Sequence, residues 1–250
     1  MNKRGQITLF LIVLLVIVIG TSLVLFITLK TPPKELKPID KQSLVFYIEN
    51  CLDRAIDVSV KQLCWNGFYT EIRRESYDYI LDNETAELLN VSEMQINYLL
   101  QGSRNYLRDY SDIEKDFNNL VKERFLECFN EYPHTDDIDY ARISKLEIND
   151  NGESINAELG FPIKIIEGEN IGVIDTFRAE SDMTLKGMYE FAELVIDNTL
   201  SHPDFIDFGF LFYFEKNIDL VPIENGPYIF FVTEKDFDED NILMFAMELE

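Results

Sequence analysis

The stretch LEINDNGESINAELG, residues 146–160, alternates apolar and polar side chains on both sides of an Asp-Asn-Gly turn. A period of two is typical of β-strands with one buried face, and Asn-Gly is a preferred turn between antiparallel strands. The apolar positions are Leu146 and Ile148 before the turn, and Ile155, Ala157 and Leu159 after it. The stretch therefore predicts a β-hairpin, and with it an antiparallel sheet in the second half of the chain.

The same pattern extends the sheet toward the C-terminus. A second turn at residues 167–170 leads into a predicted strand at 171–180. A helix with one apolar face is predicted at 185–200, and Pro203 follows it. Further strands are predicted at residues 208–214, 228–233 and 242–249.

Toward the N-terminus the period changes from two to that of a helix. Residues 41–64 carry apolar side chains at steps of three and four, and Asn66-Gly67 is suited to the left-handed conformation that ends a helix. A Ser-x-x-Glu capping box opens a second helix within residues 111–133. Residues 68–110 are less regular and predict short helices, one of them opened by a capping box at 92–95. Helices followed by a mainly antiparallel sheet with one inserted helix define an α+β fold.

The N-terminal segment has a different character. Residues 7–29 form a run of 23 residues without charge, Pro, Asn or Gln. At roughly 1.5 Å per residue a helix of this length reaches about 34 Å, enough to cross a bilayer core. A buried core helix rarely lacks a polar face over such a length, and a cleaved secretory signal has a shorter apolar run. We therefore predict a membrane-spanning helix at residues 6–30.

Charge divides the chain in the same way. The formal net charge is −24, from 22 Lys and Arg against 46 Asp and Glu, and residues 1–31 hold three basic residues and no acidic one. The predicted parts are a basic leader at 1–5, the spanning helix at 6–30, a Pro-rich spacer at 31–40 and an acidic α+β domain at 41–250. So acidic a domain repels nucleic acid and anionic lipid head groups, which excludes both as expected partners. Positive charge flanks both ends of the helix, so charge alone does not orient it.

The segment KRGQITLF, residues 3–10, resembles the class III signal peptides of archaeal type IV pilin-like proteins. In that family a prepilin peptidase cuts after the Gly that follows a short basic segment. The resemblance implies a processing site made of Lys3, Arg4, Gly5 and Gln6, with the cut between Gly5 and Gln6. It also implies that the domain lies outside the membrane and that the helix serves as anchor and as packing core of a filament. Bacterial pilins carry a Glu five residues after the cut, where this chain has Phe10. The alternative to a processed class III signal is a plain signal anchor that is not cut.

Elsewhere the chain is similar to a group of uncharacterised archaeal membrane-anchored proteins. The resemblance lies in YIENCL at residues 47–52, WNGFY at 65–69 and Phe245-Ala246. That group implies no function for this chain.

Three cysteines are present, at Cys51, Cys64 and Cys128, and their spacing fits no zinc pattern. Cys51 and Cys128 lie on the apolar faces of the two predicted helices. If these helices pack together, a disulfide between Cys51 and Cys128 closes a long loop and contributes about 4 kcal/mol. The alternative is that all three are buried thiols.

Other polar motifs are weak. Asp236, Asp238 and Asp240 alternate in a way that suits Ca²⁺, but an EF-hand would need Gly at Asn241 and Glu at Met247, so we predict a solvated turn and no metal site. His134 and His202 are the only histidines, and neither belongs to a recognisable catalytic or metal pattern. No phosphate-binding Gly-rich loop is present, so no cofactor is expected.

These features predict a non-enzymatic structural or interaction protein of the cell surface. It is expected to be pilin-like, single-pass, anchored in the cell membrane by residues 7–29, with its C-terminal domain extracytoplasmic. The expected partners are the membrane, a prepilin peptidase, and further subunits, identical or different, bound through the N-terminal helix. The alternative is a solitary anchored binding module, a receptor or cation-binding ectodomain outside any filament. A third class, an ectoenzyme with a non-local site, has no motif to support it.

Overall fold

The computed structural model describes residues 41–80, 93–133, 138–167, 170–214, 216–234 and 242–249. The chain divides into two compact units, Met1–Ile39 and Asp40–Glu250, and the described residues belong to the second. Within these ranges no helix is both long and apolar enough to cross a membrane; the span expected at residues 7–29 lies outside them.

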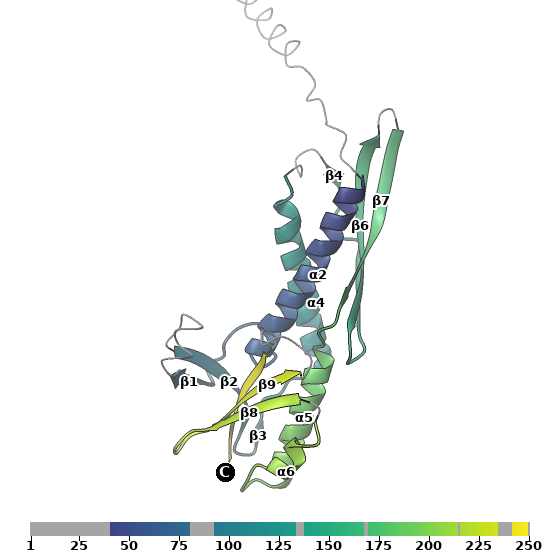
Figure 1. Ribbon diagram of the computed structural model, residues 1–250. Helices are drawn as coiled ribbons and strands as arrows, with labels where there is room; N and C mark the ends of the chain where they lie inside the picture. The colour runs from purple at the N-terminus through teal and green to yellow at the C-terminus, as the bar shows by residue number, and fades with distance from the viewer. Residues whose placement is uncertain are drawn as a thin grey trace, which may run out of the picture. The chain divides into compact units, whose positions relative to one another are not determined.

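Two long helices, α2 (Lys41–Trp65) and α4 (Tyr110–Asn130), pack against each other (Figure 1). Each buries one apolar stripe, as the helical spacing predicts. Helix α2 ends in a Schellman motif, in which Phe68 N donates to Leu63 O at 2.7 Å and Gly67 N donates to Cys64 O at 3.1 Å. Gly67 has φ +55°, so the left-handed end expected at this position is confirmed.

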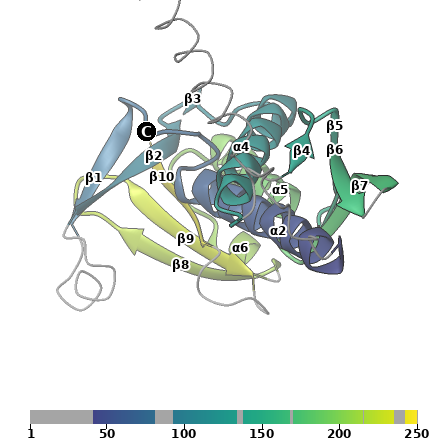
Figure 2. The same ribbon diagram turned by 90° about the horizontal axis from the view of Figure 1, so that it is seen from above.

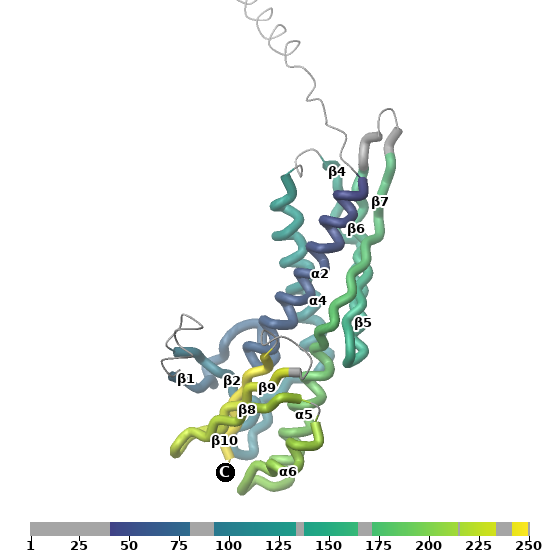
Figure 3. The backbone as a smooth tube through the Cα atoms, in the orientation of Figure 1, coloured from purple at the N-terminus to yellow at the C-terminus, as the bar shows by residue number. Residues whose placement is uncertain are grey.

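The first sheet contains the predicted hairpin. Its strands are β4 (Asp139–Tyr140), β5 (Lys145–Asp150), β6 (Ile155–Glu167) and β7 (Asn170–Ser181), with β6 between β7 on one side and β4 and β5 on the other. Leu146 lies opposite Leu159, which confirms the hairpin. The Phe161 ring of β6 meets those of Phe125 and Phe129 of α4 at 5.3 and 4.9 Å between centroids. Strand β7 runs beside α2 (Figure 3), so this sheet leans on both helices.

The second sheet has the order β1-β2-β10-β9-β8, with β3 paired to β2 (Figure 2). All its pairs are antiparallel except β2 with β10, which is parallel. The strands are β1 (Ser76–Ile80), β2 (Glu93–Gln101), β3 (Arg104–Asn105), β8 (Lys216–Pro222), β9 (Tyr228–Glu234) and β10 (Ile242–Glu248). The prediction of an α+β fold with mainly antiparallel strands is thus confirmed, with the strands divided between two sheets.

Helix α5 (Lys186–Ser201) is the predicted inserted helix and connects the first sheet to the short helix α6 (Phe208–Leu211). The Phe191 ring of α5 meets the Phe214 ring edge-on at 5.0 Å, and Tyr189 meets Phe68 at 5.8 Å. In the second sheet Phe230 and Phe245 stack on one face at 4.6 Å. The opposite face carries a second apolar cluster, formed by Ile96, Tyr98, Ile229, Met244 and Ala246.

Three local predictions are wrong. In the described residues 68–80 and 93–110, strands β1 to β3 are present where short helices were predicted. Residues 93–95 of the expected capping box lie in β2, and Ser92 is outside the described residues. The middle of β2 is buried on both faces, which removes the alternation that identifies a strand. Residues 208–214, predicted as a strand, begin with helix α6, because the Asp207 side chain accepts a hydrogen bond from Phe210 N at 3.0 Å. Helix α4 begins at Tyr110 after Asp109, which makes no side-chain cap, so the expected capping box at Ser111 does not open it.

Candidate functional site

Several residues singled out in the sequence lie outside the described residues. These are the expected processing residues Lys3, Arg4, Gly5 and Gln6, the acidic turn at 236–240, and His134. His202 lies at the end of α5, where its Nδ1 is 3.2 Å from Asn198 O.

The predicted cysteine pair is brought together by the two long helices. Cys51 of α2 and Cys128 of α4 form a disulfide with Cα atoms 5.6 Å apart, across a sequence separation of 77 residues. Cys51 is buried and Cys128 half-buried, while Cys64 is buried elsewhere on α2. The disulfide thus ties the first helix of the domain to a helix far along the chain.

The residues around this disulfide stabilise the packing of α2 against α4. Tyr47 OH donates to Cys128 O at 2.8 Å, and the Tyr47 and Tyr132 rings lie 4.8 Å apart. Burial, followed by the charge of Glu131, raises the pKa of Tyr47. A groove of about 190 Å³ follows the helix pair and is lined by Arg54, Ala55, Val58, Arg124, Glu127, Cys128 and Glu131. Tyr47 therefore fixes the end of α4 beside the disulfide.

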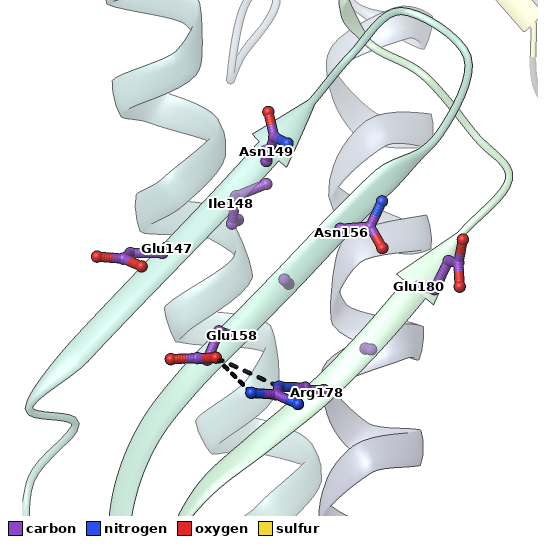
Figure 4. Close-up of a pocket in the computed structure, with 9 residues that line it drawn as sticks. Glu147, Ile148, Asn149, Asn156, Glu158, Arg178 and Glu180 are labelled. Carbon is purple, nitrogen blue, oxygen red and sulfur yellow. Dashed lines mark hydrogen bonds and ion pairs between the residues drawn. The ribbon is translucent and has the colours of Figure 1, made fainter.

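A larger hollow, of about 550 Å³, lies on the outer face of the first sheet (Figure 4). Outward-pointing polar side chains of three neighbouring strands line it: Glu147 and Asn149 of β5, Asn156 and Glu158 of β6, and Arg178 and Glu180 of β7. Across its floor Arg178 Nη2 and Glu158 Oε2 are 3.1 Å apart. Lys145 Nζ bonds Glu147 Oε2 at 2.7 Å, and this bond raises the pKa of Lys145. The face is acidic and open, and within the described ranges no three His, Cys, Asp or Glu side chains cluster closely enough to hold a metal ion.

An acidic row of α2 follows the edge of β7. Glu49 Oε1 accepts a hydrogen bond from Arg178 N at 3.4 Å, and Asp57 Oδ1 accepts one from Ser181 Oγ at 2.7 Å. Between them on the helix, the pKa of Asp53 is raised by burial, then by the charges of Asp57 and Asp182. Glu49 and Asp57 thus bond α2 to β7, while the negative charges of Asp53 and Asp57 repel one another.

The most elaborate polar cluster centres on Asp150, which the sequence shows only as a turn residue. Its carboxylate accepts hydrogen bonds from five groups: Gly152 N, Thr184 Oγ1, Leu185 N, Lys186 N and Tyr110 OH. Leu185 N and Lys186 N, at 2.9 and 2.8 Å, belong to the N-cap and the first residue of α5, where a carboxylate is favoured by the helix dipole. Burial and the charge of Asp150 raise the pKa of Tyr110 far above its usual range. Apart from the turn contact with Gly152 N, no local signal marks this role, because the other four donors lie in segments remote from residue 150.

The site-bearing part of the chain is thus an acidic α+β domain with a disulfide-linked helix pair and an open polar sheet face. No family model, no curated protein and no solved structure matches the chain.

Proposed function

We propose that this chain is a membrane-anchored structural or interaction protein of the cell surface, related in its export to archaeal pilin-like proteins. The leader at residues 1–5 is removed by a prepilin peptidase after Gly5, residues 6–30 anchor the chain, and residues 41–250 lie outside the membrane. The coarser part of this description, an α+β domain from residue 41 onward, is the observed fold.

One observation carries the proposal beyond the sequence: the disulfide between Cys51 and Cys128. Disulfides persist in oxidising compartments and are rare where thiols are kept reduced. The paired cysteines therefore support an extracytoplasmic domain. The positive charges at both ends of the expected helix do not determine its orientation. An outside domain agrees with the orientation that a class III signal implies.

The non-enzymatic part of the proposal rests on how the polar groups are used. The Asp150 carboxylate accepts hydrogen bonds from the start of α5 and from two other segments. Asp57 and Glu49 accept hydrogen bonds from β7. His202 stands at a helix end, with its ring 5.6 Å from that of Phe205. These contacts are those of a scaffold that presents surfaces to partners.

The topology is tested by protease treatment of intact cells of the native host that express a C-terminally tagged chain. We expect loss of the tag from intact cells, with a membrane-embedded fragment left behind. A tag protected until the cells are lysed would contradict the exterior domain. Electron microscopy of immunolabelled surface filaments then separates a filament subunit from the alternative, a solitary binding module.

A further inference from the structure

An exposed group of aromatic side chains surrounds α6. Phe205, Phe208, Phe212 and Tyr213 are 52%, 54%, 88% and 87% exposed. We call these four residues the aromatic patch. Ile206 and Leu211 beside them are buried, so the backbone is fixed to the domain while the rings project outward. Contiguous exposed apolar side chains of this size mark interaction surfaces.

The aromatic patch has a strongly acidic setting. Residues 187–215 hold six Asp and Glu residues and no Lys or Arg. Asp204 is exposed within the patch and Asp207 is half-buried at the start of α6. A surface that combines exposed rings with carboxylates is complementary to one rich in arginine, because guanidinium groups both stack on rings and pair with carboxylates.

The same domain carries such a surface on β3 and on the segments before β1 and after β3. Guanidinium groups and tyrosine rings alternate there in the order Arg104, Tyr106, Arg73, Tyr69, Arg108. The distances from guanidinium carbon to ring centroid are 4.7, 4.9, 4.9 and 5.6 Å along this series. We call these five residues the arginine–tyrosine ladder. It is held internally by a hydrogen bond from Tyr69 OH to Tyr106 O.

The ladder retains unneutralised charge at one end. Arg73 and Arg108 pair with Glu75 and Asp116 at 3.0 and 2.6 Å. Arg104 is exposed, and in the described part of the chain it has no carboxylate partner. The domain has a large excess of carboxylates, so an exposed arginine that pairs with none of them is available to bind another molecule.

We propose that the aromatic patch of one copy of this chain docks on the arginine–tyrosine ladder of a second copy. Phe212 and Tyr213 extend the alternation by stacking beyond Arg104, and Asp204 supplies its carboxylate. Tyr and Arg are among the residues most enriched at the centres of protein interfaces. The contact joins two different surfaces, and Figure 2 shows α6 and β3 apart from one another, so the contact is heterologous and can repeat from one copy to the next. This docking rests on the proposed function, because it specifies how subunits of an interaction protein meet outside the membrane.

The test is photo-cross-linking of the full chain in neutral phosphatidylcholine vesicles, with p-benzoylphenylalanine at position 212. Phe212 is almost fully exposed, so this substitution leaves the fold intact. We expect a cross-linked dimer in which the photoreactive residue is joined to a peptide from residues 69–108. The matched control carries the same group at Phe46, which is 68% exposed on α2, and should give no such product. Monomer alone, or a cross-link to a different segment of the second copy, would overturn the docking.

Charge reversal identifies the partner surface and its direction. Arg104→Glu in an untagged acceptor chain should lower the cross-linked yield about tenfold, as expected for a like-charge contact, and Asp204→Arg in the photoreactive chain should restore it. Arg142→Glu, at an exposed arginine before β5, is the matched control and should change nothing. Arg104→Glu placed in the photoreactive chain instead should leave its cross-linking to a wild-type acceptor intact. Equal loss from both placements would contradict a contact between unlike surfaces. The assay requires neither leader cleavage nor export, so its failure leaves those parts of the proposed function to their own tests.

Discussion

Opening the disulfide between Cys51 and Cys128 should remove a large part of the domain's stability. The bond closes a sequence separation of 77 residues, and the chain-entropy treatment assigns a loop of this size about 4 kcal/mol. Domains of this kind have free energies of unfolding of roughly 5–15 kcal/mol. Reduction should therefore lower the free energy of unfolding by about 4 kcal/mol, a third or more of the total for most such domains.

The chain offers a convenient probe for this experiment. Trp65 is the only tryptophan, and it is the last residue of α2, the helix that carries Cys51. Urea unfolding of the full chain in mild detergent, followed by Trp65 fluorescence with and without reductant, measures the difference. The control is the Cys51→Ala, Cys128→Ala double variant, whose midpoint should match that of the reduced chain and should not respond to reductant. Equal midpoints for the oxidised and reduced wild-type chain would refute the reasoning, because the loop would then contribute nothing.

Three further predictions test individual contacts by the same unfolding assay. Asp150→Ala should lower the free energy of unfolding by on the order of 3 kcal/mol, because it removes the charged acceptor of several partly buried donors, and Asp150→Asn should lower it by less. Two variants as stable as wild type would show that the cluster is unimportant. Asp53→Asn should raise the free energy of unfolding near pH 7 but not at about pH 3. The reason is that the pKa of Asp53 is higher in the folded than in the unfolded state, so its ionisation destabilises the fold as the pH rises through these two pKa values. A loss of stability at neutral pH would contradict this. Gly67→Ala should destabilise the domain by more than Gly152→Ala. Both glycines have positive φ, but an added Cβ at Gly67 would lie 3.2 Å from Met244 O, whereas the one at Gly152 would meet nothing within 4 Å. Equal losses of stability would be inconsistent with crowding at Gly67.

Elements with one buried face were predictable from the sequence. Helices α2, α4 and α5 and the hairpin of β5 and β6 each show a clear period, because solvent covers their other face. Strand β2 lost that signal because its middle residues are buried on both faces of the sheet. Its parallel partner lies about 150 residues away, a pairing that no local pattern encodes.

The site features divide in the same way. The cysteine pair was predictable because each cysteine lies on the apolar stripe of a helix, so packing of two helices brings them together. The role of Asp150 was not predictable, because four of its five donors come from Tyr110 and from residues 184–186 at the start of α5. The arginine–tyrosine ladder likewise joins segments separated by strand β2, and only the fold sets them side by side.

The proposed location of the domain outside the membrane depends on the residues before the expected membrane-spanning helix. A cut leader would orient the domain outside the membrane, in the kind of compartment where the disulfide between Cys51 and Cys128 persists. The most direct measurement is the mass of the N-terminal peptide of the mature chain, purified from membranes of its native host, with Gly5→Val as a variant that blocks the cut and Gly20→Val as its matched control. We predict that the mature wild-type chain and the Gly20→Val chain begin at Gln6, and that the Gly5→Val chain keeps its leader. A wild-type chain that begins at Met1 would contradict the pilin-like account.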